Sequence, residues 1–271
     1  MTTKVPLPLV LSSVALLMFS QGNILADTVF QVTTLAGNGL PGFTDGPGTN
    51  AAFSQPNGVA FDGAGNVYVA DLMNHAVRKI TTNGTVSTLA GNGTAGFRNG
   101  IGTNASFWYP SGVAVDGSGN VFVADIYNHA IRKITTNGTV TTLAGKGTYG
   151  FRDGTGTNAL FDYPIGVAVD GSGNVFVADS DNCSIRKIAP GGVVTTLAGT
   201  GSDGFVDGTG TNASFSFPQG VAVDRNGYVY VADAGNNAVR KIGPDGVVTT
   251  LSGNGSYGFL NRTGTNATFR E

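Results

Sequence analysis

A unit of 54 residues is repeated four times along this chain of 271 residues. Each copy carries an Asn that lies three residues after an Asp and four residues before an Arg-Lys-Ile triplet: Asn74, Asn128, Asn182 and Asn236. The surrounding segments read NVYVADLMNHAVRKI, NVFVADIYNHAIRKI, NVFVADSDNCSIRKI and YVYVADAGNNAVRKI. Self-similarity with such a period indicates a propeller, a solenoid or another repeat array, in which neighbouring units share a core.

A single copy predicts four antiparallel strands. Residues 111–116 (SGVAVD) and 120–125 (NVFVAD) alternate in polarity, and a Gly-Ser-Gly turn separates them. Residues 130–134 (AIRKI) follow after a polar loop, and an Asn-Gly turn leads to residues 139–145 (TVTTLAG). We therefore expect each copy to form a four-stranded sheet, with the long loop from residue 91 to 112 packed through recurring Phe and Pro residues.

The composition leaves little capacity for helix. Glu occurs once and Gly occurs 43 times in a chain rich in Val and Thr. A four-stranded sheet is only marginally stable alone, so the sheets are expected to stack face to face about an axis. The sequence thus predicts an all-β protein, a β-propeller.

The repeats resemble the NHL repeat family. Two copies contain the letters Asn-His, at Asn74-His75 and Asn128-His129, ahead of Arg-Lys-Ile, and the resemblance covers about residues 30–271. It implies a β-propeller and a role as a binding scaffold. We expect blades at about residues 38–91, 92–145, 146–199 and 200–253, an extra N-terminal strand from Phe30 to Gly37 and a partial repeat at 254–271. These pieces predict an incomplete or open ring of the five- to six-bladed type, whose edges association with another chain could cover.

The first 26 residues are typical of a cleaved signal peptide. An apolar run from Val5 to Phe19 precedes Ile24 and Ala26, which have the spacing of a signal-peptidase site. A membrane anchor is the alternative, which two early prolines and a short apolar core disfavour. We expect the propeller to occupy residues 27–271, without a membrane span after cleavage, in a secreted, periplasmic or cell-surface protein. Its single cysteine, Cys183, allows no internal disulfide.

The charge pattern argues against nucleic acid as a partner. Charged residues make up 12% of the chain, the net charge is −2, and the basic residues beyond the four Arg-Lys pairs are scattered. We therefore expect no nucleic acid partner.

Every copy contains an Asp seven residues before an Arg, across the turn between the second and third strands. A guanidinium group matches a carboxylate in two hydrogen bonds, and recurrence in every copy favours a structural role. The predicted ion pairs are Asp71 with Arg78, Asp125 with Arg132, Asp179 with Arg186, and Asp233 with Arg240.

Three other patterns bear on cofactors. Asp62, Asp116, Asp170 and Asp224 end the predicted innermost strands and could hold calcium, but their recurrence in every blade favours turns in which each carboxylate caps backbone N–H groups. One repeat position holds His75, His129, Cys183 and Asn237, which blade spacing should keep beyond the reach of a shared zinc ion. The G-x-G-x-x-G segments lack the helix of a dinucleotide site. We expect no cofactor, with calcium as the alternative.

The residues that vary between copies are the candidates for function, because both loops that carry them are expected on one face of the propeller. The candidate ligand-binding residues are Trp108, Tyr109, Tyr127, Tyr163, Met73, Asp181 and Phe217. Aromatic residues with a polar tip are favoured binding anchors, but these could equally fill gaps between blades. The sequence favours a secreted, non-enzymatic module that binds a protein or a glycan. The alternatives are a lyase or lactonase with a divalent metal, and a structural spacer from a larger surface protein.

Overall fold

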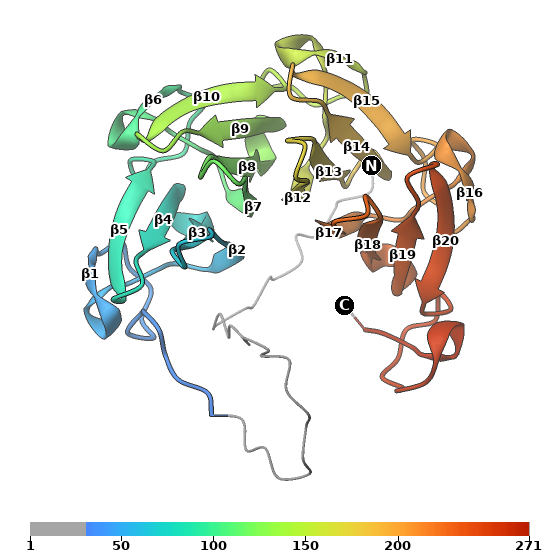
Figure 1. Ribbon diagram of the computed structural model, residues 1–271, viewed down its shortest axis with the longest axis horizontal. Helices are drawn as coiled ribbons and strands as arrows, with labels where there is room; N and C mark the ends of the chain where they lie inside the picture. Colours follow the sequence, from blue (N-terminus) through green and yellow to red (C-terminus); the bar gives the residue numbers. More distant parts are fainter. Residues whose placement is uncertain (1–30, 271) are drawn as a thin grey trace, which may run out of the picture.

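The computed structural model describes residues 31–270, so the predicted signal peptide lies outside the described residues. These residues form four five-stranded antiparallel sheets that follow one another around an arc (Figure 1). The innermost strands contact one another in the order β2 (Pro56–Phe61), β7 (Pro110–Val115), β12 (Pro164–Val169), β17 (Pro218–Val223). The predicted all-β, open propeller is confirmed. Within the described residues, no helix is long and apolar enough to cross a membrane.

Every sheet is built from the same series of strands, punctuated by two 3-10 helices (η) except in the third sheet, which has one. The first sheet comprises β1 (Gly46–Pro47), η1 (Gly48–Asn50), β2 (Pro56–Phe61), β3 (Val67–Asp71), η2 (Leu72–Asn74), β4 (Ala76–Ile80) and β5 (Thr85–Ala90). The second comprises β6 (Gly100–Ile101), η3 (Gly102–Asn104), β7 (Pro110–Val115), β8 (Val121–Asp125), η4 (Ile126–Asn128), β9 (Ala130–Ile134) and β10 (Thr139–Ala144).

The third and fourth sheets follow the same order. The third comprises β11 (Gly154–Thr155), η5 (Gly156–Asn158), β12 (Pro164–Val169), β13 (Val175–Asp179), β14 (Ser184–Ile188) and β15 (Val193–Ala198). The fourth comprises β16 (Gly208–Thr209), η6 (Gly210–Asn212), β17 (Pro218–Val223), β18 (Val229–Asp233), η7 (Ala234–Asn236), β19 (Ala238–Ile242) and β20 (Val247–Ser252), and η8 (Gly264–Asn266) follows it.

Each sheet has one strand more than the sequence predicted. The long loop before the innermost strand returns along the outer edge, where β1 pairs with β5 through Gly46 with Val86 and Pro47 with Thr85. A two-residue pairing carries no periodicity that a sequence pattern could reveal. It covers part of an edge that would otherwise expose unpaired backbone groups.

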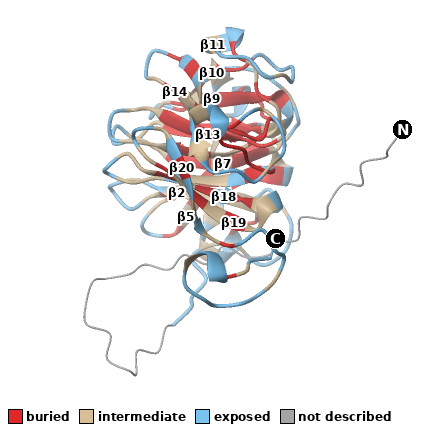
Figure 2. Cartoon of the chain, turned by 90° about the vertical axis from the view of Figure 1, so that its right-hand side faces the viewer, coloured by how far each residue is buried: buried red, intermediate tan, exposed pale blue. Residues whose placement is uncertain are grey.

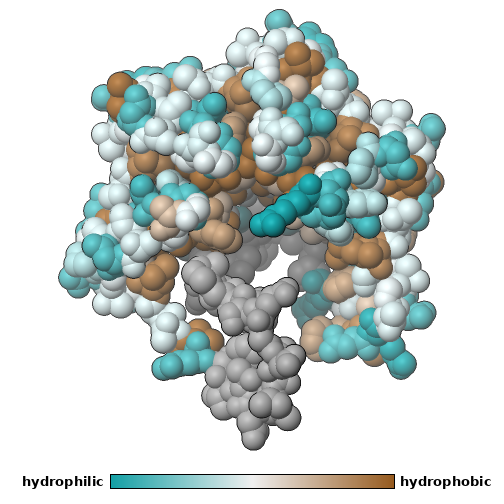
Figure 3. Space-filling view, viewed as in Figure 1, coloured by the Kyte–Doolittle hydropathy of each residue, from teal (hydrophilic) through white to brown (hydrophobic). Residues whose placement is uncertain are grey.

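The hydrophobic core lies between the sheets, as the buried bands in Figure 2 show. Phe107 is fully buried and packs with Tyr68 of the first sheet and Val123 of the second. The residues at the same repeat position, Phe161 and Phe215, are also fully buried. The long loops are therefore packed, as expected. Figure 3 shows hydrophilic and hydrophobic residues interspersed over the face in view.

The arc is open in the described residues. Residues 31–37 form no strand, contrary to the expectation for Phe30 to Gly37, although Gly37 donates a hydrogen bond to the Gly48 carbonyl at 3.1 Å, just as Gly91 does to Gly102 at 3.2 Å. The segment follows the course of an outer strand, but among residues 31–270 no strand pairs with it. At the other end, Ala232 is exposed, whereas its counterparts Ala124 and Ala178 are fully buried between sheets.

Whether the outer side of the fourth sheet is exposed in solution can be tested at one glycine position of the repeat. A Cβ on Gly112 would lie 2.5 Å from the Ile165 carbonyl oxygen of the next innermost strand, whereas a Cβ on Gly220 meets only the Ala232 side chain at 3.2 Å. We expect Gly112→Ala to destabilise the fold by about 1–3 kcal/mol through overpacking. Gly220→Ala should cost less than about 1 kcal/mol. Urea denaturation of both variants checks this, and equal losses would mean that another sheet covers the fourth one in solution.

Candidate ligand-binding site

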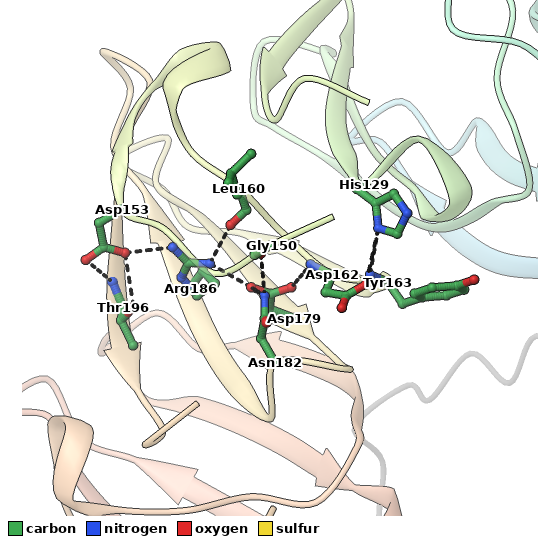
Figure 4. A network of polar contacts seen from close by, with 10 residues as sticks. All are labelled: His129, Gly150, Asp153, Leu160, Asp162, Tyr163, Asp179, Asn182, Arg186 and Thr196. Carbon is green, nitrogen blue, oxygen red and sulfur yellow. Dashed lines mark hydrogen bonds and ion pairs between the residues drawn. The ribbon is translucent and has the colours of Figure 1, made fainter. Parts of the chain in front are cut away.

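A buried arginine organises each blade, and Figure 4 shows the third one. Arg186 Nη1 donates to Asp179 Oδ2 at 2.6 Å and to the Leu160 carbonyl at 3.0 Å, and Nη2 donates to Asp153 Oδ1 at 2.7 Å. Its guanidinium carbon lies 4.9 Å from the ring centre of Phe151 and 5.2 Å from that of Phe161. The long loop is thereby joined to the sheet.

The same aspartate positions the loop face. Asp179 Oδ1 accepts a hydrogen bond from the Asp162 N–H at 2.8 Å, and Asp179 Oδ2 accepts one from the Asn182 amide at 2.9 Å. The Asn182 amide also donates to the Gly150 carbonyl at 2.8 Å. The Asn that marks each repeat therefore ties the loop between the second and third strands to the long loop.

The structure brings the other predicted ion pairs together in the same way. The Nη1 to Oδ2 distance is 2.7 Å in each of the pairs Arg78 with Asp71, Arg132 with Asp125, and Arg240 with Asp233. Complete burial raises the pKa of Asp125 to about 6, against the opposing effects of Arg132 and two further hydrogen-bond donors. These carboxylates serve the scaffold, since both oxygens are occupied by protein donors.

The sequence reasoning missed a second partner of each arginine. Asp45, Asp153 and Asp207 each accept a hydrogen bond from the Nη2 atom of their blade's arginine, and Asn99 takes that place in the second blade. This residue lies 33 positions before the arginine. An Asp or Asn recurs two residues after a Phe in every repeat, and this recurrence could have identified the second partner from the sequence.

We predict a strong coupling between Asp125 and Arg132. Asp125→Ala and Arg132→Ala should each destabilise the protein by about 3–5 kcal/mol, because each leaves a buried charge without compensation. The double variant should lose much less than the sum of the two single losses. A double-mutant cycle by chemical denaturation measures this, and additive losses would contradict a paired structural role.

A repeated backbone hydrogen bond joins the two variable loops in each blade. Tyr127 N–H donates to the Trp108 carbonyl at 3.2 Å, and Asp181 N–H donates to the Asp162 carbonyl at 3.1 Å. The same bond joins Met73 to Ser54 at 3.1 Å and Gly235 to Ser216 at 2.9 Å. The scaffold thus presents one pair of variable side chains in each blade.

Four of the predicted binding residues lie together and form what we call the aromatic platform: Trp108, Tyr109, Tyr127 and Tyr163. Tyr127 is central to it. Its ring centre lies 5.4 Å from that of Trp108, 5.0 Å from that of Tyr109 and 5.1 Å from that of Tyr163. Trp108 is 41% exposed and Tyr127 is 40% exposed, so the platform faces solvent.

The other three candidates lie at corresponding positions in other blades. Asp181 lies in the third blade and is half-buried. Met73 in the first blade and Phe217 in the fourth are exposed. In the described residues, no ring contact joins Phe217 to the aromatic platform.

The repeat position of the two histidines connects neighbouring blades. His75 Nδ1 accepts a hydrogen bond from the Tyr109 N–H at 3.2 Å, and His129 Nδ1 accepts one from the Tyr163 N–H at 3.3 Å (Figure 4). Both tyrosines have a left-handed backbone, with φ of 57° and 49°. No pattern within one repeat could reveal this role, because donor and acceptor belong to different repeats.

Burial lowers the pKa of both His75 and His129, and for His129 the charge of Asp181 acts in the opposite direction. A histidine whose folded pKa lies below its unfolded value stabilises the fold above the unfolded pKa, and this stability is lost as the pH falls through the folded pKa. Protonation at Nδ1 also removes the acceptor for the tyrosine N–H.

We therefore predict that His75→Asn combined with His129→Asn reduces the loss of stability between pH 7.5 and pH 5. Asn already occupies this repeat position at Asn237 and tolerates the left-handed backbone. Thermal melts of both proteins at the two pH values measure the difference. The buried carboxylates titrate in both proteins and so cancel in the comparison, and an unchanged pH dependence would refute the histidine assignment.

The possible calcium ligands have a local structural use. Asp116 Oδ1 accepts hydrogen bonds from the N–H groups of Ser118 and Asn120 at 2.9 and 2.8 Å, and Asp116 Oδ2 accepts one from the Asn120 side chain. This is the turn geometry that the sequence favoured. Across residues 31–270, no three His, Cys, Asp or Glu side chains are grouped to hold a metal ion.

The geometry defines an open β-propeller with an exposed aromatic platform on its loop face. The NHL repeat family profile matches four segments, residues 53–80, 107–134, 161–188 and 215–242. The chain is 31% identical over 297 residues to Protein SUPPRESSOR OF QUENCHING 1, chloroplastic, of Arabidopsis thaliana, covering 81% of this chain and 28% of that protein. This chain belongs to the NHL repeat family. It spans less than a third of the length of that relative.

Solved structures share the fold. An auxiliary nutrient binding protein from Bacteroides thetaiotaomicron matches with a TM-score of 0.58 at 19% identity, covering 74% of this chain and 49% of that chain. A streptogramin B lyase matches with a TM-score of 0.54 at 12% identity, covering 73% of this chain and 55% of that chain. At such identities the likeness shows the fold alone.

Proposed function

We propose that this NHL protein is a secreted, non-enzymatic binding module that recognises a protein or a glycan through its loop face. The observation that carries the proposal is the aromatic platform, in which ring contacts join the second and third blades while Trp108 and Tyr127 remain exposed. Tyrosine and tryptophan offer large, rigid contact areas with a polar tip, and such residues dominate binding energy at interfaces.

The division between repeated and variable residues supports binding over a purely structural role. The buried arginine and its aspartate recur in all four blades, whereas the residues joined by the loop hydrogen bond differ from blade to blade. A spacer would gain nothing from four different surface pairs. A rigid scaffold that carries variable loops is a common design for recognition.

The lyase and lactonase alternative lacks a comparable observation. The likeness to a lyase extends to the fold, and the two histidines at the loop face use Nδ1 to accept hydrogen bonds from backbone N–H groups. The exposed groups at the platform are aromatic rings, which favour stacking over acid–base chemistry. The proposal therefore assigns no catalytic residue and no cofactor.

The test is to screen the protein against glycan arrays and a panel of extracellular proteins, and then to measure variants against the best ligand. Trp108→Ala and Tyr127→Ala should each weaken binding by about 2 kcal/mol, the usual cost of removing an aromatic anchor. Ser118→Ala, in an exposed turn beside Asp116, is the control and should bind normally. Equal losses in all three variants, or losses that follow unfolding, would reject the proposal.

A further inference from the structure

The last described loop, residues 253–270, has the fold of the four long loops before it and lies beyond the fourth sheet at one end of the arc (Figure 1). Gly258 N–H donates to the Phe269 carbonyl at 2.8 Å, and the corresponding hydrogen bond of the fourth blade is 3.0 Å long. Leu260 and Thr268 exchange backbone hydrogen bonds of 3.3 and 3.1 Å across an isolated β-bridge. The loop therefore has the shape that the other loops take against their sheets.

Each of the other long loops holds the buried arginine of its blade, and the fourth blade is an example. The Arg240 guanidinium carbon lies 4.9 Å from the ring centre of Phe205 and 5.1 Å from that of Phe215. Arg240 Nη1 donates to the Ser214 carbonyl at 2.9 Å, and Nη2 donates to Asp207 Oδ1 at 2.7 Å. Two rings and several oxygen acceptors of one loop thus surround one guanidinium group.

The last loop carries the same set of groups, which we call the arginine cradle. Phe259 is 90% exposed, whereas the Phe residues at its repeat position in the four blades are 38–43% exposed. Asn261 stands where Asn99 accepts a hydrogen bond from Arg132 Nη2 at 2.8 Å. The last loop therefore exposes a surface that binds an arginine in every blade. The residues of the cradle are Gly258, Phe259, Leu260, Asn261, Thr268 and Phe269.

The first described segment is in a similar condition at the other end of the arc. Val32 is 75% exposed, whereas the Val residues at its repeat position are at most 1% exposed. Those residues lie on the outer strand that pairs with the arginine-bearing strand, as Val248 of β20 pairs with Ile242 of β19. Each end of the arc thus exposes apolar side chains that an arginine-bearing strand covers elsewhere. The four counterparts of Val32 are Val86, Val140, Val194 and Val248.

We propose that the arginine cradle binds a β-hairpin of a second polypeptide that carries the Asp-x-x-Asn-x-x-x-Arg pattern of this repeat. The arginine of the hairpin stacks on Phe259 and Phe269 and donates to the Asn261 side chain. Its Asn donates to the Gly258 carbonyl, as Asn236 does to the carbonyl at that repeat position at 2.8 Å. This inference goes beyond the proposed function and does not rest on it, because the cradle and the aromatic platform share no residue.

The chemistry of the cradle selects this occupant over others. Ring faces combined with several oxygen acceptors suit a flat cation with five N–H donors, whereas a purely apolar segment leaves the acceptors unused. A second copy of this chain is a poor occupant, because its four arginines are already buried in their own blades, each paired with an aspartate. Moving one of them would leave a buried carboxylate without compensation.

The experiment titrates the full chain with a synthetic peptide that has the sequence of residues 218–242, which includes Asp233, Asn236 and Arg240. In a matched peptide, citrulline replaces Arg240, which keeps the shape and removes the charge. Calorimetry should show binding of the arginine peptide and at least about tenfold weaker binding of the citrulline peptide, because the cation–ring contacts and the charge-assisted hydrogen bonds are lost.

A second measurement avoids the self-association of free strands. The same segment is joined directly after residue 271, so that its first residue stands 54 residues after Pro218, the period of the repeat. The joined chain should melt at a higher temperature than the original chain. A version with glutamine in place of the added arginine should lose most of this gain, because the aspartate of the hairpin loses its partner.

Three variants of the chain locate the contact. Phe259→Ala should weaken binding of the arginine peptide by about tenfold and leave the melting temperature of the free chain unchanged, because the ring is exposed. Tyr149→Ala removes an exposed aromatic side chain from another long loop and is the matched control. Asn261→Asp introduces the Asp that three blades have at this position and should tighten binding of the arginine peptide alone, by about two- to fivefold.

The outcomes are distinct. Absence of peptide binding together with an unchanged melting temperature of the joined chain would overturn the inference, as would equal binding of the two peptides or equal effects of Phe259→Ala and Tyr149→Ala. If the chain self-associates in sedimentation and Phe259→Ala abolishes this, a second copy occupies the cradle and the inference is wrong. Trp108→Ala should leave peptide binding unchanged, and a loss would place the peptide on the aromatic platform instead.

Discussion

The loop face of this protein depends on one buried arginine in each blade. In the third blade, the Arg186 guanidinium contacts two Phe rings and donates to Asp179 inside the sheet and to Asp153 in the long loop. Removing such charges from water is costly, so the arrangement contributes geometric specificity more than stability. Because Asp179 also holds the Asp162 N–H, the position of the variable residues follows from this ion pair.

The scaffold fixes where the variable loop residues lie, whatever side chains they carry. The backbone bond between the two loops has almost the same length in the second and third blades, 3.2 and 3.1 Å, although it joins Trp108 to Tyr127 in one and Asp162 to Asp181 in the other. Substitution at these positions can change what is bound without disturbing the core. The repeat therefore offers adjacent surfaces of different character on a common frame.

The sequence predicted the features that depend on local pattern. Strand alternation, Gly-rich turns and the seven-residue spacing of Asp125 and Arg132 are all visible within one copy, and the structure forms these strands and joins these two side chains. Features formed by distant residues were not accessible. The pairing of β1 with β5 and the hydrogen bond from Tyr109 to His75 connect segments more than thirty residues apart. The shared face of the aromatic residues was expected, but their ring contacts depend on the distance between blades.

Backbone strain helps to fix the platform. Tyr109 and Tyr163 have φ values of 57° and 49°, a region that costs bulky residues about 1–3 kcal/mol. Each of these tyrosines donates its N–H group to the histidine of the preceding blade, so the strained backbone is held by the contact between blades. A side chain held in this way loses little freedom when a ligand binds, which lowers the entropic cost of association. The interface between blades thus both stabilises the propeller and pre-organises its binding surface.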